Sequence, residues 1–445
     1  MNILHVTAQK PTETGSGVYL TGLARGFSAL PVIGSQGILA GVYREDIPVI
    51  NESLSAFAAH HESSPVTLYP VVFNSDALPF HIFAMSDVMP YPSSLYRSMT
   101  GEQLALFSRA FLTAADEAVR DLKPDVIICH HLYLLTSLIR EHFPDIPVIG
   151  FCHNTDLTQF GAHDLAHELI LQNIPKLDAV CALHEQQKHL IADMLHVPAA
   201  RIHVVGAGYD SDVFFANTDT SSEPDGESLS FSDRTDTERT VHFVFTGKIS
   251  RAKGLAHLMR ALPLVAGSDP ELNLSFTMVG GAGDRDEYDE IRSLAGACPY
   301  PVVFTGRISE EKLVSIYRRH DCFILPSLNE GLPLCVIEAL ACGLSVVMTD
   351  LPGIRSWLDS HLPDAPILYV DPPCVEDDAA PVGKDFSGLH NVQGTRFEHD
   401  LARAVSAAAS NILSARTACV PDLSSLTWEG LARRVLGIVS ECKEQ

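Results

Sequence analysis

Residues 329–338 read Asn-Glu-Gly-Leu-Pro-Leu-Cys-Val-Ile-Glu, and this stretch decides how the rest of the chain is interpreted. The apolar run before it, Cys322–Leu325, is typical of a buried strand. Apolar residues at helical spacing then predict a helix that begins at Pro333, where a missing N–H is harmless. Glu330 is therefore expected on a strand-to-helix loop, and Glu338 about one turn inside the helix.

The chemistry of such a loop favours a charged ligand. Unpaired N–H groups and the positive end of the helix dipole attract a diphosphate. A carboxylate can accept two hydrogen bonds from a vicinal diol. Because Glu330 and Glu338 flank the anion site, the stretch suits a nucleoside diphosphate attached to a sugar. The alternative is an ordinary helix start with an acidic first turn.

The longer segment around it, "PSLNEGLPLCVIEALACGLSVV" at 326–347, resembles the signature of the family-four retaining glycosyltransferases. Those proteins have the GT-B fold, so the resemblance implies two facing doubly wound α/β domains with a cleft between them. It also implies that the amino-terminal domain binds an acceptor and the carboxyl-terminal domain a nucleotide sugar. The implied reaction is sugar transfer with retention at the anomeric carbon.

A second stretch, "GKISRAKG" at 247–254, follows the predicted strand Val241–Thr246 and begins a helix. Its cations Lys248, Arg251 and Lys253 lie at a helix amino end, which favours an anion. In the family an arginine and a lysine here hold the donor phosphates. Lys253 matches the lysine, whereas Lys248 stands where arginine is usual, which keeps the charge but loses the bidentate fork. A solvated basic loop is the alternative.

Near the amino terminus, the predicted strand Asn2–Thr7 precedes a glycine loop and a helical pattern from Val18 to about Phe27. Gly15 and Gly17 could line a donor or acceptor site, or form a plain loop before a helix. The dinucleotide fingerprint is incomplete because Leu20 stands where a third glycine belongs. A nicotinamide dehydrogenase is therefore disfavoured.

Histidines follow two predicted strands of the first domain. His153 comes just after Pro147–Phe151, at the end of a strand where open α/β sheets bind ligands. By resemblance it is the family's cleft histidine, which contacts the donor sugar and the acceptor side. The pair His130-His131 has no third ligand nearby in sequence, so a metal site is disfavoured. GT-B enzymes generally act without a bound metal.

The resemblance thus implies a set of site residues, in which Gly306-Arg307-Ile308 occupies the place of the nucleobase-binding loop. The catalytic candidates are His153, Lys248, Lys253 and Glu330. The donor-binding candidates are Gly15, Gly17, Lys248, Arg251, Lys253, Arg307, Ile308, Glu330, Gly331, Leu332, Pro333, Leu334 and Glu338.

Two local motifs predict helix starts. Thr100 and Gln103 form a plausible capping box for a helix that extends to about Leu122. Asp284-Arg285-Asp286 is expected to place negative charge at a helix start rather than to bind a metal.

Composition and resemblance divide the chain into regions. Residues 1–215 and 241–424 are predicted to form the two Rossmann-like domains. Residues 216–240 are rich in Ser, Thr, Asp and Glu, which predicts a flexible linker. By resemblance, residues 425–445 form a last helix that packs back on the first domain. A stretch from about 359 to 398, rich in Pro and Asp, is interpreted as an insertion.

The composition restricts the partners. A net charge of −24 over 445 residues argues against nucleic acid and against an anionic membrane surface. Ten scattered cysteines without a Cys-x-x-Cys pair indicate reduced thiols. Apolar runs are too short to span a membrane and no signal-like segment opens the chain, so a cytoplasmic protein is expected.

The sequence therefore predicts a retaining hexosyl- or N-acetylhexosaminyltransferase. Its donor would be a nucleotide sugar, with a UDP-sugar as first choice, and its acceptor a small molecule or glycan. No separate cofactor is expected. The alternatives are a GT-B sugar phosphorylase and a non-catalytic protein that binds nucleotide sugars.

Overall fold

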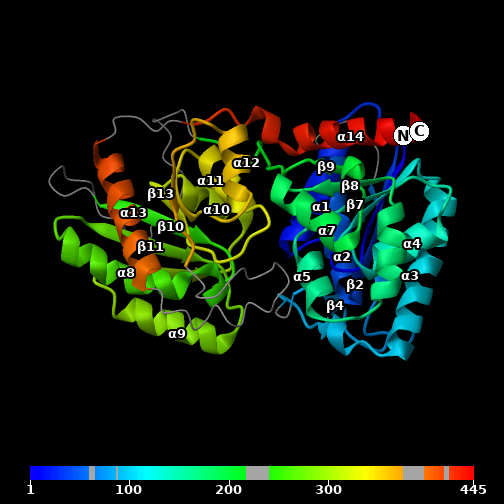
Figure 1. Cartoon of the computed structure of the whole chain (residues 1–445), viewed down its shortest axis with the longest axis horizontal. Helices are drawn as coiled ribbons and strands as arrows, with labels where there is room; N and C mark the ends of the chain where they lie inside the picture. The colour runs from blue at the N-terminus through cyan, green and yellow to red at the C-terminus, as the bar shows by residue number, and fades with distance from the viewer. Residues whose placement is uncertain (60–65, 87–88, 217–239, 374–394, 415–419, 445) are drawn as a thin grey trace. The chain divides into compact units, whose positions relative to one another are not determined.

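The computed structural model describes residues 1–59, 66–86, 89–216, 240–373, 395–414 and 420–444 (Figure 1). The chain forms two compact units. The first holds residues 1–209 and the described residues from Ser424 onward, and the second holds the described residues between Asp210 and Leu423. The predicted linker lies mostly at 217–239, outside the described residues.

Within the described residues, seven strands of the first unit form one parallel sheet in the order β3-β2-β1-β6-β7-β8-β9. The strands are β1 (Ile3–Thr7), β2 (Gln36–Val42), β3 (Val66–Val72), β6 (Val126–His130), β7 (Val148–Phe151), β8 (Ala179–Ala182) and β9 (Ile202–Val204). A separate short pair is formed by β4 (Phe83–Ala84) and β5 (Ser94–Leu95). The helices are α1 (Gly15–Ser28), α2 (Ile47–Ala59), α3 (Gly101–Leu122), α4 (Leu134–His142), α5 (Thr155–Ala162), α6 (His167–Asn173), α7 (Glu185–Leu195) and α14 (Trp428–Glu444).

The second unit repeats this architecture with six described strands, in the order β12-β11-β10-β13-β14-β15. They are β10 (Val241–Thr246), β11 (Leu274–Val279), β12 (Val302–Gly306), β13 (Cys322–Leu325), β14 (Ser345–Thr349) and β15 (Ile367–Val370). The helices are α8 (Leu255–Ser268), α9 (Arg285–Gly296), α10 (Glu310–Tyr317), α11 (Leu334–Ala341), α12 (Ile354–His361) and α13 (Thr395–Ser414).

In both sheets the central strands are mostly buried, whereas the edge strands β3 and β12 are partly exposed. All residues of β1, β6, β7 and β8 are buried, as expected when helices cover both faces of a parallel sheet. In each sheet the strand order reverses once, between β1 and β6 in the first and between β10 and β13 in the second. Ligands of open α/β sheets bind beside the carboxyl ends of the strands at such a reversal.

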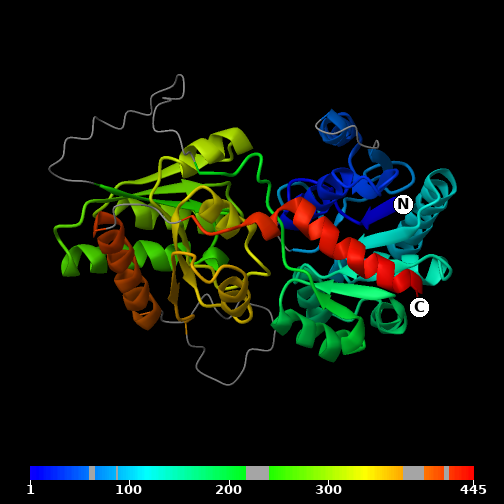
Figure 2. The ribbon, with the colours of Figure 1, turned by 90° about the horizontal axis from the view of Figure 1, so that it is seen from above.

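The last helix, α14, packs on α1 of the first unit (Figure 2). A Cβ atom added at Gly22 of α1 would overlap the ring of Trp428, so the two helices are in close contact. Asp125 also links residues near the two termini of the chain, both of which belong to this unit. Its carboxylate accepts a hydrogen bond from the backbone N–H of Asn2 at 2.8 Å and from Lys443 Nζ at 3.0 Å.

Four helix starts test the local motifs of the sequence. The capping box of Thr100 and Gln103 is confirmed, and the Asp284 side chain caps α9 as expected. The prediction that α1 begins at Val18 was wrong. It begins at Gly15, because Thr14 Oγ1 accepts the N–H of Gly17 at 3.1 Å and caps the helix earlier. Pro333 is the N-cap of α11 rather than its first residue.

The stretch interpreted as an insertion at 359–398 includes part of the fold itself. It contains the edge strand β15, which pairs in parallel with β14 from Val346↔Ile367 to Thr349↔Val370. It ends within α13, which lies beside α8 (Figure 1). Residues 374–394 lie outside the described residues.

A close backbone approach joins the loops that follow β10 and β13. Gly254 has φ +69°, and a Cβ atom there would overlap the carbonyl oxygen of Pro326. The N–H of Leu328 donates to the carbonyl oxygen of Ala252 at 2.9 Å. Only glycine satisfies both the positive φ and the contact at position 254.

We therefore expect Gly254→Ala to destabilise the protein by about 1–3 kcal/mol, through backbone strain and displacement of the Pro326 loop. Gly267→Ala in the same region is the matched control. Nothing lies within 4 Å of a Cβ atom there, so that substitution should stabilise the helix by about 0.4–1 kcal/mol. Urea unfolding measures both values, and equal effects of the two substitutions would contradict the assigned role of Gly254.

Candidate functional site

Two predicted site residues form an ion pair at the strand reversal of the second unit. Lys253, on the loop after β10, places Nζ 2.5 Å from Glu330 Oε1, on the loop after β13. Burial acts to lower the pKa of Lys253, but the Glu330 carboxylate outweighs it, so the net shift is upward. Lys253 is therefore charged, and its charge is matched by Glu330 within the protein.

Two further cations stand close to this pair. Partial burial lowers the pKa of Lys248, and repulsion from Lys253 and Arg307 lowers it further. The side chains of Lys248 and Arg307 run past Gly283 and Gly281, where added Cβ atoms would lie 2.5 and 2.9 Å from them. The loops after β10, β11 and β12 thus bring Lys248, Lys253 and Arg307 into mutual electrostatic contact. Such a group favours a multiply charged anion.

Arg251 does not join this group, in contrast to its predicted place on the donor phosphates. Its guanidinium pairs with Glu290 of α9 at 2.5 Å, and its backbone N–H donates to Glu287 at 3.0 Å. These carboxylates come from α9 and already match the charge of Arg251. Its position at a helix start in sequence therefore did not predict where its side chain points.

Glu338 lies on α11, four residues after the helix begins at Leu334. Burial raises the pKa of its carboxyl to about 8, and the negative charges of Glu310 and Asp210 add to the shift. The two predicted glutamates therefore differ in kind. Glu330 is paired with a cation, whereas Glu338 holds a proton that a ligand could use or displace.

The remaining predicted donor residues lie on the same loops. Gly331, Leu332 and Pro333 connect Glu330 to α11, and Leu334 is its first residue. Ile308 lies with Arg307 on the loop between β12 and α10. Sequence reasoning missed two hydroxyls at strand ends, Ser327 on the loop after β13 and Thr349 at the end of β14. Each is 1% exposed, and no described residue offers its oxygen atom a hydrogen bond.

In the first unit, the predicted site residue His153 lies beside His130 and His131, near the reversal of strand order. His153 Nε2 lies 3.0 Å from His130 Nδ1, and the two rings are nearly parallel with centroids 5.3 Å apart. His131 meets the His153 ring edge-on at 4.9 Å. Burial lowers the pKa of each of these histidines, and their proximity lowers the pKa of His130 and His153 further. The cluster is therefore neutral at neutral pH.

A buried carboxylate holds the two histidine loops together. Asp156 is 0% exposed and accepts the backbone N–H of Leu132 at 2.8 Å and of His153 at 3.2 Å. His131 and Asn154 on these loops have positive φ values of 75° and 71°. Strained backbone of this kind persists only where surrounding bonds enforce it. Asp156 was missed from sequence, although its place three residues after His153 was a usable signal.

Gly15 and Gly17 form the first turn of α1 rather than a loop. A Cβ atom at Gly17 would lie 2.8 Å from the backbone nitrogen of Thr12, so packing within the chain already requires glycine there. Nothing lies within 4 Å of a Cβ atom at Gly15.

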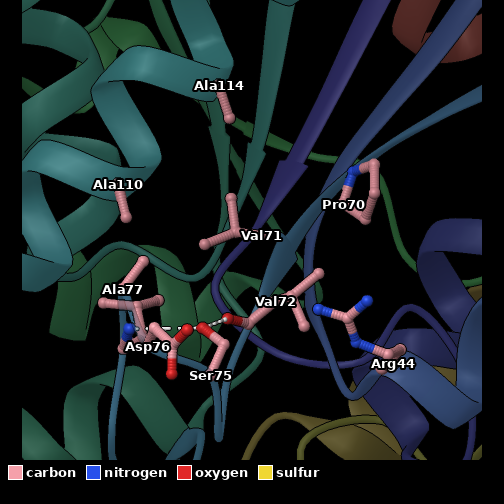
Figure 3. A pocket seen from close by; sticks show the side chains of 10 residues that line it. Arg44, Pro70, Val71, Val72, Ser75, Asp76, Ala77, Ala110 and Ala114 are labelled. Atoms are coloured by element: carbon pink, nitrogen blue, oxygen red, sulfur yellow. Dashed lines mark hydrogen bonds between the residues drawn. The ribbon is translucent and has the colours of Figure 1, made fainter.

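A cavity of about 360 Å³ opens elsewhere in the first unit, between β3 and α3 (Figure 3). Arg44, Ser75 and Asp76 line it together with Ala110 and Ala114 of α3. None of the predicted site residues lies in its lining. Within the described residues, no set of three His, Cys, Asp or Glu side chains could hold a metal ion. No described helix is long and apolar enough to cross a membrane.

Comparison with known proteins agrees with this geometry. Residues 81–213 match the family described as Glycosyltransferase Family 4, and residues 240–378 match the family described as Glycosyl transferases group 1. Two parallel-sheet Rossmann-like domains with these matches define a GT-B glycosyltransferase fold. The chain belongs to the glycosyl transferases of group 1, of the family-four type, as the sequence signature predicted.

Individual relatives are distant. The D-inositol 3-phosphate glycosyltransferase of Pseudarthrobacter chlorophenolicus is 29% identical over 183 residues, which is 41% of this chain and 41% of that protein. Mannosylfructose-phosphate synthase of Agrobacterium fabrum is 25% identical over 282 residues, 62% of this chain and 55% of that protein. The chain thus spans less than two thirds of either relative. Anabaena HepE in complex with UDP-glucose superimposes with a TM-score of 0.56 at 14% identity, covering 99% of this chain and 100% of that chain.

The contrast between the two glutamates predicts opposite effects on stability. Glu338 has a raised pKa in the folded protein, so its contribution is favourable below the ordinary carboxyl pKa of 4.5 and is lost as pH rises to about 8. Glu338→Gln should therefore leave stability nearly unchanged at pH 4.5 and increase it by about 2–4 kcal/mol at pH 8.5. Glu330→Gln should lower stability by about 1–3 kcal/mol at pH 8.5, because Lys253 loses its partner.

Urea unfolding of the three proteins in matched buffers measures these differences. If Glu338→Gln destabilises the protein equally at both pH values, Glu338 is not protonated in the folded state.

Proposed function

We propose that this protein transfers a sugar from a nucleoside diphosphate sugar, with a UDP-sugar as the first choice, to a small-molecule or glycan acceptor. The observation that carries this proposal is the interaction of Lys248 with Lys253 and Arg307, together with the pairing of Lys253 with Glu330 on the loop before α11. These cations suit the two phosphates, and Glu338 suits the ribose hydroxyls. The relatives named as glycosyltransferases and the UDP-glucose complex of HepE support the same substrate class.

The ion pair between Lys253 and Glu330 suggests how the sugar nucleotide binds. A diphosphate that approaches Lys253 would compete with Glu330 for the ammonium group. Glu330 would then be free to accept hydrogen bonds from the transferred sugar. We assign Lys248 and Lys253 to the departing diphosphate, since charge develops there as the sugar leaves. These lysines take the place of a metal ion, so we propose that no metal or separate cofactor is needed.

We further propose that the anomeric configuration is retained. The sequence of the first domain offers no obvious carboxylate as a covalent nucleophile. Attack on the same face, assisted by the leaving phosphate, therefore suits this site better than a glycosyl-enzyme intermediate. His153 is the residue of the first unit to which we assign a role in handling the sugar.

A panel of nucleotides and nucleotide sugars tests the proposal, first by thermal shift without added metal and then by release of nucleotide. A nucleoside diphosphate present at about 100 times its dissociation constant should stabilise the fold by about 2.7 kcal/mol. Binding without nucleotide release would instead indicate a sugar-nucleotide-binding protein. If no nucleotide shifts the melting curve, with or without magnesium, the proposal is wrong.

Substitution of the cations should separate the phosphates from the nucleoside. Lys253→Ala and Lys248→Ala should each weaken UDP binding by about tenfold or more, because each removes a charged hydrogen bond to phosphate. Uridine binding should hardly change. Isothermal titration calorimetry measures both affinities.

Arg251→Ala is the matched control, since Arg251 lies on the same loop but pairs with Glu290 and Glu287. It should leave UDP affinity within about twofold, as expected for a group that does not contact the ligand. A loss of UDP affinity in Arg251→Ala equal to that in Lys253→Ala would show that the phosphates lie elsewhere on the loop.

A further inference from the structure

A hydrogen bond joins two imidazole rings at the carboxyl ends of neighbouring strands. His130 is the last residue of β6 and His153 follows β7. His130 Nδ1 and His153 Nε2 are 3.0 Å apart, and the rings are nearly parallel at 13°. His130 is 3% exposed, and the hydrogen bond is partly buried. The predicted site residue His153 therefore has a hydrogen-bonded partner, His130, to which the sequence analysis assigned no function.

One proton occupies this bond, and its position fixes the tautomer of both neutral rings. If His130 Nδ1–H donates, then His153 accepts at Nε2 and carries its own proton on Nδ1. If His153 Nε2–H donates, then His130 carries its proton on Nε2. The two arrangements give His153 opposite chemical properties, because Nδ1 is a donor in the first and a bare acceptor in the second.

The surroundings of His130 Nε2 distinguish the two arrangements. This atom is buried, and no described residue forms a hydrogen bond with it. In the second arrangement it would be a buried N–H without an acceptor, which folded proteins rarely contain. In the first arrangement it is a bare ring nitrogen, and unsatisfied acceptors are tolerated more often. The first arrangement is therefore favoured.

We propose that His130 is a positioning residue that holds His153 with its proton on Nδ1. His153 then serves as a hydrogen-bond donor to an oxygen of the substrate and not as a base. The backbone supports this role, since Asp156 binds the N–H groups of both Leu132 and His153 and so fixes the two loops. The identification of that oxygen as one of the sugar nucleotide rests on the proposed function, whereas the position of the proton does not.

Nitrogen-15 NMR of the full chain labelled at histidine measures the tautomer directly at neutral pH. The His153 signals are identified by their loss in His153→Asn. We expect a protonated Nδ1 and a bare Nε2 for His153 in the wild-type protein. A protonated Nε2 on His153 would overturn the proposal.

Two substitutions at position 130 separate the hydrogen bond from the packing of the ring. His130→Phe keeps an aromatic ring but removes the donor, whereas His130→Asn keeps an N–H group near the place of Nδ1. We expect the Phe variant to give a mixture of His153 tautomers and to lower kcat about tenfold with little change in KM for the donor. The Asn variant should restore the tautomer and most of kcat.

His131→Phe is the control, because His131 touches the His153 ring edge-on without a hydrogen bond between them. It should leave the tautomer of His153 unchanged. An unchanged tautomer in a folded His130→Phe variant would overturn the proposal. If that variant does not fold, the wild-type spectrum and the spectrum of His130→Asn still establish the tautomer of His153. An absence of donor binding by the wild-type protein would refute the proposed function alone, since the spectrum reports the proton without any substrate.

Discussion

The close approach of two backbone loops is the constraint on which the proposed donor site depends. The absence of a side chain at Gly254 makes room for the carbonyl of Pro326, and the N–H of Leu328 donates to the carbonyl oxygen of Ala252 at 2.9 Å. Backbone contacts alone therefore hold the loops after β10 and β13 together. This contact sets Lys253 within 2.5 Å of Glu330, although the two residues are 77 positions apart. β10 and β13 are neighbouring parallel strands at the reversal of strand order. The loops that follow them therefore leave the sheet at the same edge.

The two units carry different kinds of polar group. The second unit gathers charge, with cations near Lys253 and two carboxylates in unlike environments, within a chain whose net charge is −24. The first unit gathers neutral imidazoles around His153, held by the buried carboxylate of Asp156. Charged groups suit the binding of phosphates, and neutral donors suit the orientation of sugar hydroxyls. This division fits a transfer reaction in which a diphosphate leaves and a hydroxyl attacks.

Sequence patterns predicted the strands Val241–Thr246 and Cys322–Leu325 and the loops that follow them, because these depend on local periodicity and a signature of fixed spacing. The assignment of Lys253 and Glu330 to one site came from the same signature. Sequence patterns could not predict which residues each charged side chain would contact in the folded chain. Arg251 pairs with α9, more than thirty residues later in the chain, and the pKa of Glu338 is raised mainly by burial, with smaller contributions from Glu310 and Asp210. The strand Ile367–Val370 was missed because four residues among prolines and aspartates give too short a pattern.

The proposed function requires a nucleoside diphosphate to bind at the strand reversal of the second unit. A crystal structure of the protein with UDP, grown without divalent metal, tests it most directly. The account predicts the diphosphate within hydrogen-bond distance of Lys248 and Lys253, the ribose hydroxyls at Glu338, and an Nζ of Lys253 that has left Glu330. A diphosphate bound at Arg251, or a nucleotide seated in the cavity beside β3 and α3, would contradict it.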